Sequence, residues 1–379
     1  MKILLVSTQD YIHHPVPSRH HYIFEELARR HEVHVPHFHV SRGPERKTRL
    51  IVHEATRYPR GGPLVHYTLN APTHFRVLEE IVRDCGIEVV VASHVLAGMA
   101  VIRAARRHDV PVVFDLKDWF PDSAAAYYNN RITKRVIHDA VWFVTRYNLE
   151  RSDRITTVSP SLVEKLRSFG YDATLITNGV DTDRFVPMDG SGMRRRLGIG
   201  EDEFVLGFEG SVERWYALDR VIAALPELLD HRPSTRLLLV GGSLFTGYME
   251  ELRKEAAELG VLDRIIFTGP VRYHDLPGYI APMDLCLIPL SPPQWVNIAL
   301  PNKFFEYSAC GKPILSTPIP DIMAIGGPHL SVYRDEAEFL ARVKDAMDRR
   351  AAYRPDVERF SWKRKAGEFE EILGGLIRR

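Results

Sequence analysis

Features that mark secreted, membrane-spanning or nucleic-acid-binding proteins are scarce in this sequence. There are three cysteines, Cys85, Cys286 and Cys310, an odd number without metal-ligand spacing, which indicates reduced core thiols of a cytoplasmic protein. No apolar run approaches the roughly 20 residues of a membrane-spanning helix. The chain leads from Met1 directly into a predicted strand, so we expect no signal peptide. A net charge of +1 argues against nucleic acid as a partner.

The usual linear signature of a metal site is also missing. Eight histidines fall within the first 39 residues, but none forms a His-Glu-x-x-His pattern on one helix. We therefore expect no metal. His13 and His14 stand apart from the others, because they follow the first predicted strand in a loop that has no glycine and continues into Pro15, Pro17 and Arg19.

Apolar segments of strand length alternate with segments of helical periodicity along most of the chain. This alternation is typical of doubly wound α/β domains, whose ligands bind at the carboxyl ends of the strands. The length of 379 residues favours two domains, and a turn-rich stretch at 185–192 predicts the ranges 1–186 and 187–379. The amphipathic helix at 131–151 is expected to face the core. Other predicted strands are 3–6, 32–35, 87–92, 110–115, 204–210, 236–240, 265–269 and 285–289, and other helices are 19–30, 73–84 and 96–108.

Residues 300–321 are the most informative stretch, and they predict a short helix followed by a buried strand. Pro301 suits the first helical position and Gly311 the residue after the helix end. The first helical turn presents free backbone N–H groups and a positive dipole end beside Lys303, which favours a bound phosphate. Glu306, one turn further on, can accept hydrogen bonds from two vicinal hydroxyls of a sugar. The pair predicts a nucleoside diphosphate, although a capped surface helix would have the same features.

The run Pro-x-Lys-Phe-x-Glu-Tyr-x-Ala-x-Gly-Lys-Pro from Pro301 resembles the donor-binding segment of glycosyltransferase family four. These enzymes are retaining, nucleotide-sugar-dependent glycosyltransferases of the GT-B architecture. The resemblance extends more weakly over nearly the whole chain. It implies two Rossmann-like domains facing a cleft, a last helix at about 361–378 that packs back toward the N-terminal domain, and no cofactor besides the donor. Glu306 matches the second member of the family's Glu-x7-Glu pair, but Ile298 stands at the first.

The same resemblance supplies the other donor-side candidates. Gly210 closes a predicted strand and lets backbone N–H groups approach a diphosphate closely. Arg214 follows as a phosphate clamp, or as part of a surface salt bridge. The backbone near Val271 is a candidate for contact with the base, and Asn297 for contact with the sugar. Lys303 and Arg214 are the predicted catalytic cations that stabilise the departing diphosphate.

Acceptor-side candidates come from the first domain. Residues 114–123 look like the Asp-x-Trp-Pro-Asp/Glu-Ser segment of one branch of the family. Asp118 is the first candidate for a catalytic or acceptor role, followed by Asp115 and Asp122, of which Asp122 also fits a helix cap. His13 and His14 are further acceptor-side candidates, and solvated loop histidines would have the same sequence.

The sequence therefore predicts a retaining glycosyltransferase in glycan, polysaccharide or glycolipid biosynthesis. Its partners would be a nucleotide-sugar donor and a saccharide or lipid-linked acceptor. The basic segment at 41–49 is either a solvated loop or a contact with an anionic membrane, which would place a cytoplasmic protein at the inner face of the cell membrane. A nucleotide-sugar epimerase on the same scaffold, and an inactive nucleotide-sugar-binding protein, are the alternatives.

Overall fold

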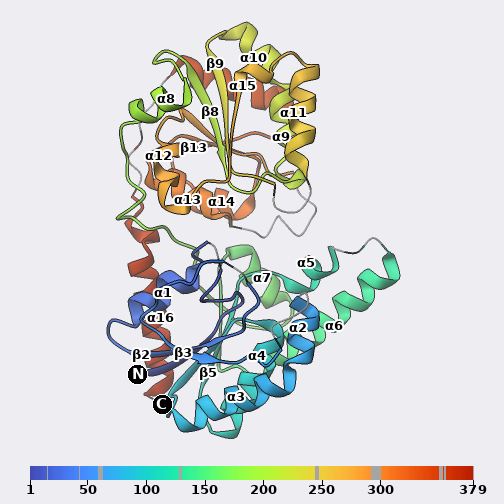
Figure 1. Ribbon diagram of the computed structural model, residues 1–379, viewed down its shortest axis with the longest axis vertical. Coiled ribbons are helices and arrows are strands. Elements are labelled where there is room, and N and C mark those ends of the chain that lie inside the picture. Colours follow the sequence, from blue (N-terminus) through green and yellow to red (C-terminus); the bar gives the residue numbers. More distant parts are fainter. Residues whose placement is uncertain are drawn as a thin grey trace. The chain divides into compact units, whose positions relative to one another are not determined.

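The chain forms two compact units, each built around its own sheet (Figure 1). The computed structural model describes residues 1–378 except 15, 42, 59–62, 127, 129, 244–246, 292–299, 350–352, 354 and 355. Unit 1 comprises Met1–Asn178 and Trp362–Arg379, and unit 2 comprises Gly179–Ser361. The predicted boundary at residue 186 is late, because the Val180 N–H donates to the Phe360 carbonyl at 2.9 Å and Phe185 is buried in the unit 2 core.

Unit 1 is a seven-stranded parallel sheet with the order β3-β2-β1-β4-β5-β6-β7. Its central strands are continuous apolar runs because helices cover both faces of a parallel sheet. The strands are β1 (Lys2–Val6), β2 (Glu32–His37), β3 (Ile51–Glu54), β4 (Val89–Ala92), β5 (Val112–Leu116), β6 (Arg154–Thr157) and β7 (Thr174–Leu175). The helices are α1 (Arg19–Leu27), α2 (Pro63–Leu69), α3 (Ala71–Asp84), α4 (Val95–Arg107), α5 (Phe120–Ala126), α6 (Arg131–Glu150), α7 (Pro160–Ser168) and α16 (Trp362–Ile377).

The last helix, α16, belongs to unit 1 although the chain reaches it only after unit 2. Its Trp362 ring stacks on Tyr22 of α1 with centroids 5.2 Å apart, and its Phe369 meets Phe24 edge-on at 5.8 Å. Figure 1 shows α16, in red, beside α1, in blue. Trp362 and Phe369 thus complete the apolar core around the first strand, which includes Ile3 and other residues of β1.

Unit 2 is a six-stranded parallel sheet with the order β10-β9-β8-β11-β12-β13. The strands are β8 (Phe204–Glu209), β9 (Thr235–Val240), β10 (Ile265–Gly269), β11 (Leu285–Ile288), β12 (Ile314–Ser316) and β13 (Leu330–Val332). The α-helices are α8 (Ser191–Leu197), α9 (Leu218–Ala223), α10 (Leu225–His231), α11 (Tyr248–Glu258), α12 (Leu276–Ile280), α13 (Asn302–Ala309), α14 (Pro320–Ile325) and α15 (Glu336–Asp348). Short 3-10 turns are η1 (Arg214–Tyr216), η2 (Leu262–Arg264), η3 (Tyr273–Asp275) and η5 (Glu358–Phe360).

Side chains of the central strand β8 alternate between two apolar cores. Phe204, Leu206 and Phe208 are buried on one face of the sheet, and Val205 is buried on the other. Such alternation follows from the period of two residues along a strand. It also fixes the end of β8, so that Glu209 and Gly210 arrive at the carboxyl edge of the sheet, where ligands of this fold class bind.

Helix α6 is a correction to the sequence analysis. Its buried residues, Thr145, Asn148 and Leu149, lie in its last turns, whereas Ile132 and Phe143 are 75% and 68% exposed. An apolar stripe along a helix predicts burial, but here the first turns are exposed and the helix packs on the unit only from its middle to its end. Among the described helices, none combines the length and the apolar character needed to cross a lipid bilayer.

Candidate active site

The first turn of α13 places Lys303 inside unit 2. Lys303 is only 5% exposed, and its Nζ lies 3.6 Å from the centroid of the Tyr216 ring and 3.9 Å from that of Phe208. Within the described part of the chain, this Nζ has no hydrogen-bond partner. A buried ammonium group normally has an anionic or hydrogen-bonding partner because its desolvation is costly. Together with the N–H groups of the helix start, Lys303 can therefore hold a phosphate.

Gly210 lies directly against this lysine. Its φ is +126°, and a Cβ at this position would lie 2.9 Å from the Lys303 Nζ. Gly241 packs against it in turn, with φ +129° and room for no Cβ, which would lie 1.9 Å from the Gly210 carbonyl oxygen. Two glycines at the ends of β8 and β9 thus bring bare backbone to the lysine, as a site for a diphosphate requires.

Glu306 forms a carboxyl pair with Glu209, a residue that the sequence analysis did not select. Both are 5% exposed, and the Tyr273 hydroxyl donates to Glu306 Oε1 at 2.7 Å. Burial, and then the charge of Glu209, raise the pKa of Glu306 well above its ordinary value. Burial also raises the pKa of Glu209, against the opposing charge of Lys303. We expect the pair to hold one proton at neutral pH, so that it can both donate and accept hydrogen bonds with sugar hydroxyls.

The structure gives the other donor-side candidates different surroundings. The Arg214 side chain is 59% exposed, pairs with Glu251 of α11 and lies over the Tyr248 ring. Val271 packs against the unit 2 core. Asn297 lies outside the described residues, as does Ile298. Of the predicted donor residues, Gly210, Lys303 and Glu306 are therefore brought together, and the roles of the remaining ones stay predictions.

In unit 1, Asp115 is a fully buried anchor at the end of β5. Its Oδ1 accepts from Arg19 at 3.3 Å and from Thr156 at 2.8 Å, and its Oδ2 bonds His20 at 2.9 Å. Burial opposes ionisation, but the Arg19 guanidinium and His20 hold the pKa of Asp115 well below its usual range. Both carboxylate oxygens thus have protein partners, and this residue joins α1 to the sheet.

The remaining acceptor-side candidates are more open. Asp118 is exposed in the loop after β5, while Asp122 pairs with Lys165 at 3.1 Å. His13 Nδ1 bonds the Gly43 carbonyl at 2.9 Å, and His14 Nδ1 bonds the Val16 carbonyl at 2.7 Å. Of the two carboxylates, Asp118 belongs to the more exposed residue, but desolvation by the surrounding protein raises its pKa above the ordinary value.

Comparison with known proteins decides the family. Residues 20–184 match Glycosyltransferase Family 4, and residues 203–349 match Glycosyl transferases group 1. These two matches cover the strands of both sheets except β1. The chain is a GT-B glycosyltransferase of the family four, group 1 type.

Individual relatives agree with this assignment. The glycosyltransferase is 30% identical to a D-inositol 3-phosphate glycosyltransferase of Geodermatophilus obscurus over 50% of this chain and 44% of the relative. It is 33% identical to the GDP-mannose-dependent alpha-(1-6)-phosphatidylinositol monomannoside mannosyltransferase of Mycolicibacterium smegmatis over 47% of this chain and 44% of the relative. These alignments therefore span less than half of each relative's length.

The fold also matches a solved structure over nearly its whole length. Anabaena HepE in complex with UDP and glucose superposes with a TM-score of 0.75 at 19% identity, covering 99% of each chain. At this identity the likeness establishes the fold alone. The ligands of the glycosyltransferase have to be inferred from its own residues.

Gly210 provides a sharp test of the phosphate site. We expect Gly210→Ala to lower stability by about 1 to 3 kcal/mol because its φ is unfavourable for alanine, and also to displace Lys303 and weaken nucleoside diphosphate binding. Gly198→Ala is the matched control, since φ is +68° there and a Cβ would meet nothing within 4 Å. Calorimetric titration should show weakened binding in Gly210→Ala alone; equal affinities in the two variants would disprove the contact with Lys303.

Proposed function

We propose that the glycosyltransferase transfers a sugar, with retention of configuration, from a nucleoside-diphosphate sugar to an acceptor hydroxyl. One observation carries the proposal: a buried lysine at the start of α13 has its Nζ against the bare backbone of Gly210 and no hydrogen-bond partner among the described residues. Phosphate is the ligand that suits an ammonium group, a helix N-terminus and a glycine backbone together.

The chemical problem in this reaction is departure of the diphosphate. As the bond between the anomeric carbon and the phosphate oxygen breaks, negative charge grows on that oxygen, and Lys303 with the N–H groups of α13 stabilises it. The acceptor oxygen bonds to the anomeric carbon from the same face, and its proton passes to the departing diphosphate. Such a path needs no carboxylate nucleophile. Arg214 would assist only if it exchanged Glu251 for a phosphate.

The carboxyl pair suits the hydroxyl groups of the donor. Glu306, oriented by the Tyr273 hydroxyl, is proposed to bind the ribose, and Glu209 adds a second buried carboxyl beside it. Glu209 would substitute for the missing first member of the family's Glu-x7-Glu pair, because it supplies, from another segment, a carboxyl that can contact donor hydroxyls. Contacts of Val271 with the base and of Asn297 with the sugar are retained as predictions.

The acceptor is proposed to be a polyol or saccharide, free or linked to a lipid. The names of the relatives support this class, since one acts on inositol 3-phosphate and another on a phosphatidylinositol monomannoside. Asp118, exposed after β5, is the proposed catalytic or acceptor-binding carboxylate. For a lipid-linked acceptor, peripheral contact with an anionic membrane follows, and the exposed apolar side chains of α6 beside Lys134 and Arg135 are suited to it.

The reaction itself is tested by incubating the purified protein with uridine and guanosine diphosphate sugars and with inositol phosphate, phosphatidylinositol or oligosaccharides. We expect one donor and acceptor pair to yield a glycoside, detected by mass spectrometry, with the anomeric configuration of the donor in its NMR spectrum. An inverted product would contradict retention. Tight donor binding without transfer or hydrolysis would instead favour an inactive binding protein.

A further inference from the structure

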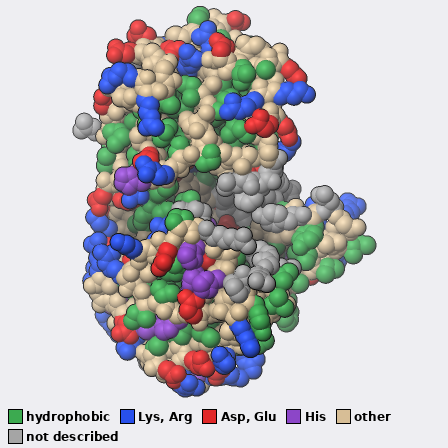
Figure 2. Space-filling view, in the orientation of Figure 1, with side chains coloured by type: hydrophobic (Ala, Val, Ile, Leu, Met, Phe, Trp, Pro, Cys, Tyr) green, Lys and Arg blue, Asp and Glu red, His purple; other side chains and the backbone are tan. Residues whose placement is uncertain are grey.

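Three histidines of unit 1 lie together at one edge of its sheet. His13 is in the loop after β1, His37 is the last residue of β2, and His39 follows two residues later. Since β3, β2 and β1 are neighbouring parallel strands, their carboxyl ends bring these side chains together with Glu54, the last residue of β3. One ring nitrogen from each histidine lies within 4.8 Å of those of the other two. Figure 2 shows histidine side chains, in purple, gathered beside acidic ones, in red, on unit 1.

Each of the three imidazoles has one nitrogen bonded to an oxygen acceptor. His13 Nδ1 bonds the Gly43 carbonyl at 2.9 Å, His37 Nδ1 bonds Glu54 Oε1 at 3.2 Å, and His39 Nε2 bonds Glu54 Oε2 at 2.5 Å. A neutral imidazole carries one proton, so an N–H directed at an oxygen leaves the other nitrogen with its lone pair. Metal-binding histidines are held in this way by carbonyl and carboxylate oxygens.

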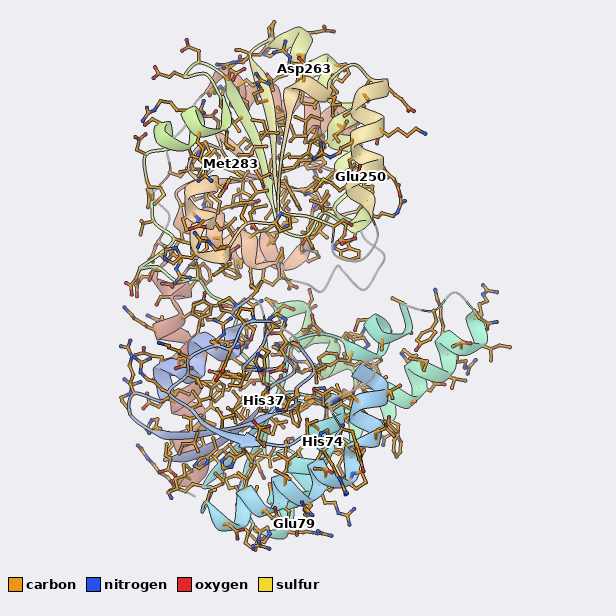
Figure 3. The ribbon with its side chains drawn as sticks, in the orientation of Figure 1. His37, His74, Glu79, Glu250, Asp263 and Met283 are labelled. Atoms are coloured by element: carbon orange, nitrogen blue, oxygen red, sulfur yellow. The ribbon has the colours of Figure 1, made fainter. Side chains whose placement is uncertain are left out.

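His37 gives the independent sign of a ligand. It is 4% exposed, and within the described residues its Nε2 is buried without a hydrogen-bond partner. The nearest anion is Asp10, whose Oδ1 lies 3.5 Å from this nitrogen and adds negative charge beside it. Figure 3 labels His37 within unit 1.

The loops that carry these residues are tied in place by Asp10. Its Oδ1 accepts from the backbone N–H groups of Ile12 and His13 at 3.1 Å each, and its Oδ2 accepts from Val40 and Ser41 at 2.9 and 3.0 Å. His39, directly before Val40, has φ +49°, a backbone conformation that costs energy for a residue other than glycine. The hydrogen bonds of Asp10 to the neighbouring backbone thus hold His39 in a strained conformation at the cluster.

We propose that His13, His37 and His39 bind a divalent transition metal ion of the zinc class, with Glu54 as the carboxylate that orients two of the ligands. Three imidazole nitrogens suit zinc, copper or nickel better than magnesium or calcium. They also leave a fourth coordination position for water or another ligand. The expectation of no metal rested on spacing along one helix, whereas these ligands come from two loops and a strand end.

A second cluster, His34, His53 and Cys85, serves as the control. Its members also lie within 4.8 Å of one another, but His34 Nδ1 bonds His53 at 2.8 Å and His34 Nε2 bonds Glu32 at 2.9 Å. Both nitrogens of His34 are thus engaged, and a metal could bind there only by breaking a hydrogen bond.

The test uses the full chain after chelator treatment and dialysis. Titration with zinc should show one equivalent bound and a raised Tm, and cobalt should give the visible absorption bands of a nitrogen-ligated ion. His39→Ala should weaken zinc binding by about 100-fold and Glu54→Gln by about 10-fold, while His53→Ala should leave it unchanged. Glu54 is 65% exposed at its side chain, so its variant tests the proposal even if His39→Ala fails to fold.

Three results would overturn the proposal: no stoichiometric zinc binding by the wild-type protein, undiminished binding in both His39→Ala and Glu54→Gln, or loss of binding in His53→Ala. If the cluster is held together only by ion pairs between protonated histidines and Glu54, the wild-type protein will show no stoichiometric zinc binding.

Discussion

Lys303→Met is expected to lower kcat/KM for sugar transfer by about 10² to 10³-fold, the usual effect of removing one group that stabilises transition-state charge. Methionine keeps most of the buried apolar volume between Phe208 and Tyr216 but removes the cation against Gly210. The nucleoside diphosphate would then meet only the helix N-terminus and glycine backbone, so its affinity should fall as well. Steady-state kinetics and calorimetric titration measure the two effects.

Stability distinguishes this loss from unfolding. Because the Lys303 Nζ has no hydrogen-bond partner among the described residues, its replacement removes the cost of a buried charge. It also removes the attraction to two rings and to the carboxyls of Glu209 and Glu306, whose pKa values the charge of Lys303 lowers. These contributions oppose one another, so we expect the Tm of Lys303→Met to stay close to the wild-type value. Lys254→Met is the control, since Lys254 is 79% exposed and pairs with Glu258 on the surface. Wild-type activity in Lys303→Met would contradict the site.

Acidification is expected to destabilise unit 1 steeply. Burial lowers the pKa of His20 to about 4, of His21 to about 3, of His74 to about 4 and of His94 to about 3, from 6.5 in the unfolded chain. Between the folded and the unfolded pKa values, the unfolded chain binds protons that the folded unit does not bind. The stabilisation is thus fully present above pH 6.5 and falls below it, by about 5 kcal/mol per pH unit when all four contribute.

Urea unfolding at about pH 7.5 and about pH 5 tests this linkage. His74→Phe should remove about one quarter of the slope, because His74 is one of the four histidines. Phenylalanine suits the site, since the ring centroids of His74 and Phe38 lie 4.9 Å apart and the His74 Nε2 is buried without a partner in the described part of the chain. His274→Gln changes a side chain that is 82% exposed and should leave the slope intact. The raised pKa values of Glu209 and Glu306 act in the opposite direction on unit 2. A pH-independent unfolding midpoint for unit 1 would contradict the assignment.

Local sequence patterns predicted much of the fold. Both doubly wound sheets follow from apolar runs alternating with helical periodicity, and Gly210, Lys303 and Glu306 follow from turn and helix-end chemistry. Strand β3 was not predicted: the segment before it is polar and Ile51 is 44% exposed. Helix α6 shows that an apolar stripe does not reveal whether a partner surface exists.

Long-range pairings account for the rest. Glu209 was not selected because its carboxyl pairs with that of Glu306, which lies on another element. A carboxyl before a glycine at a strand end was nevertheless a sequence signal that could have identified it. The hydrogen bonds of Asp115 join residues of α1, β5 and β6. Asp115 was predicted to contact the acceptor, but its carboxylate is buried and bonded within the protein. The His13, His37 and His39 cluster likewise depends on strand order, which spacing along the chain does not encode.

The most direct measurement is a calorimetric titration of wild type, Lys303→Met and Glu306→Gln with uridine, guanosine, adenosine and thymidine diphosphates and their sugars. The donor site predicts that one nucleotide binds the wild-type protein and that Lys303→Met weakens binding of both the diphosphate and its sugar. It also predicts that Glu306→Gln weakens binding, because the amide has one acceptor oxygen for the two vicinal hydroxyls of ribose. Absence of binding for every nucleotide, or equal affinities in all three proteins, would contradict a donor site at Gly210, Lys303 and Glu306.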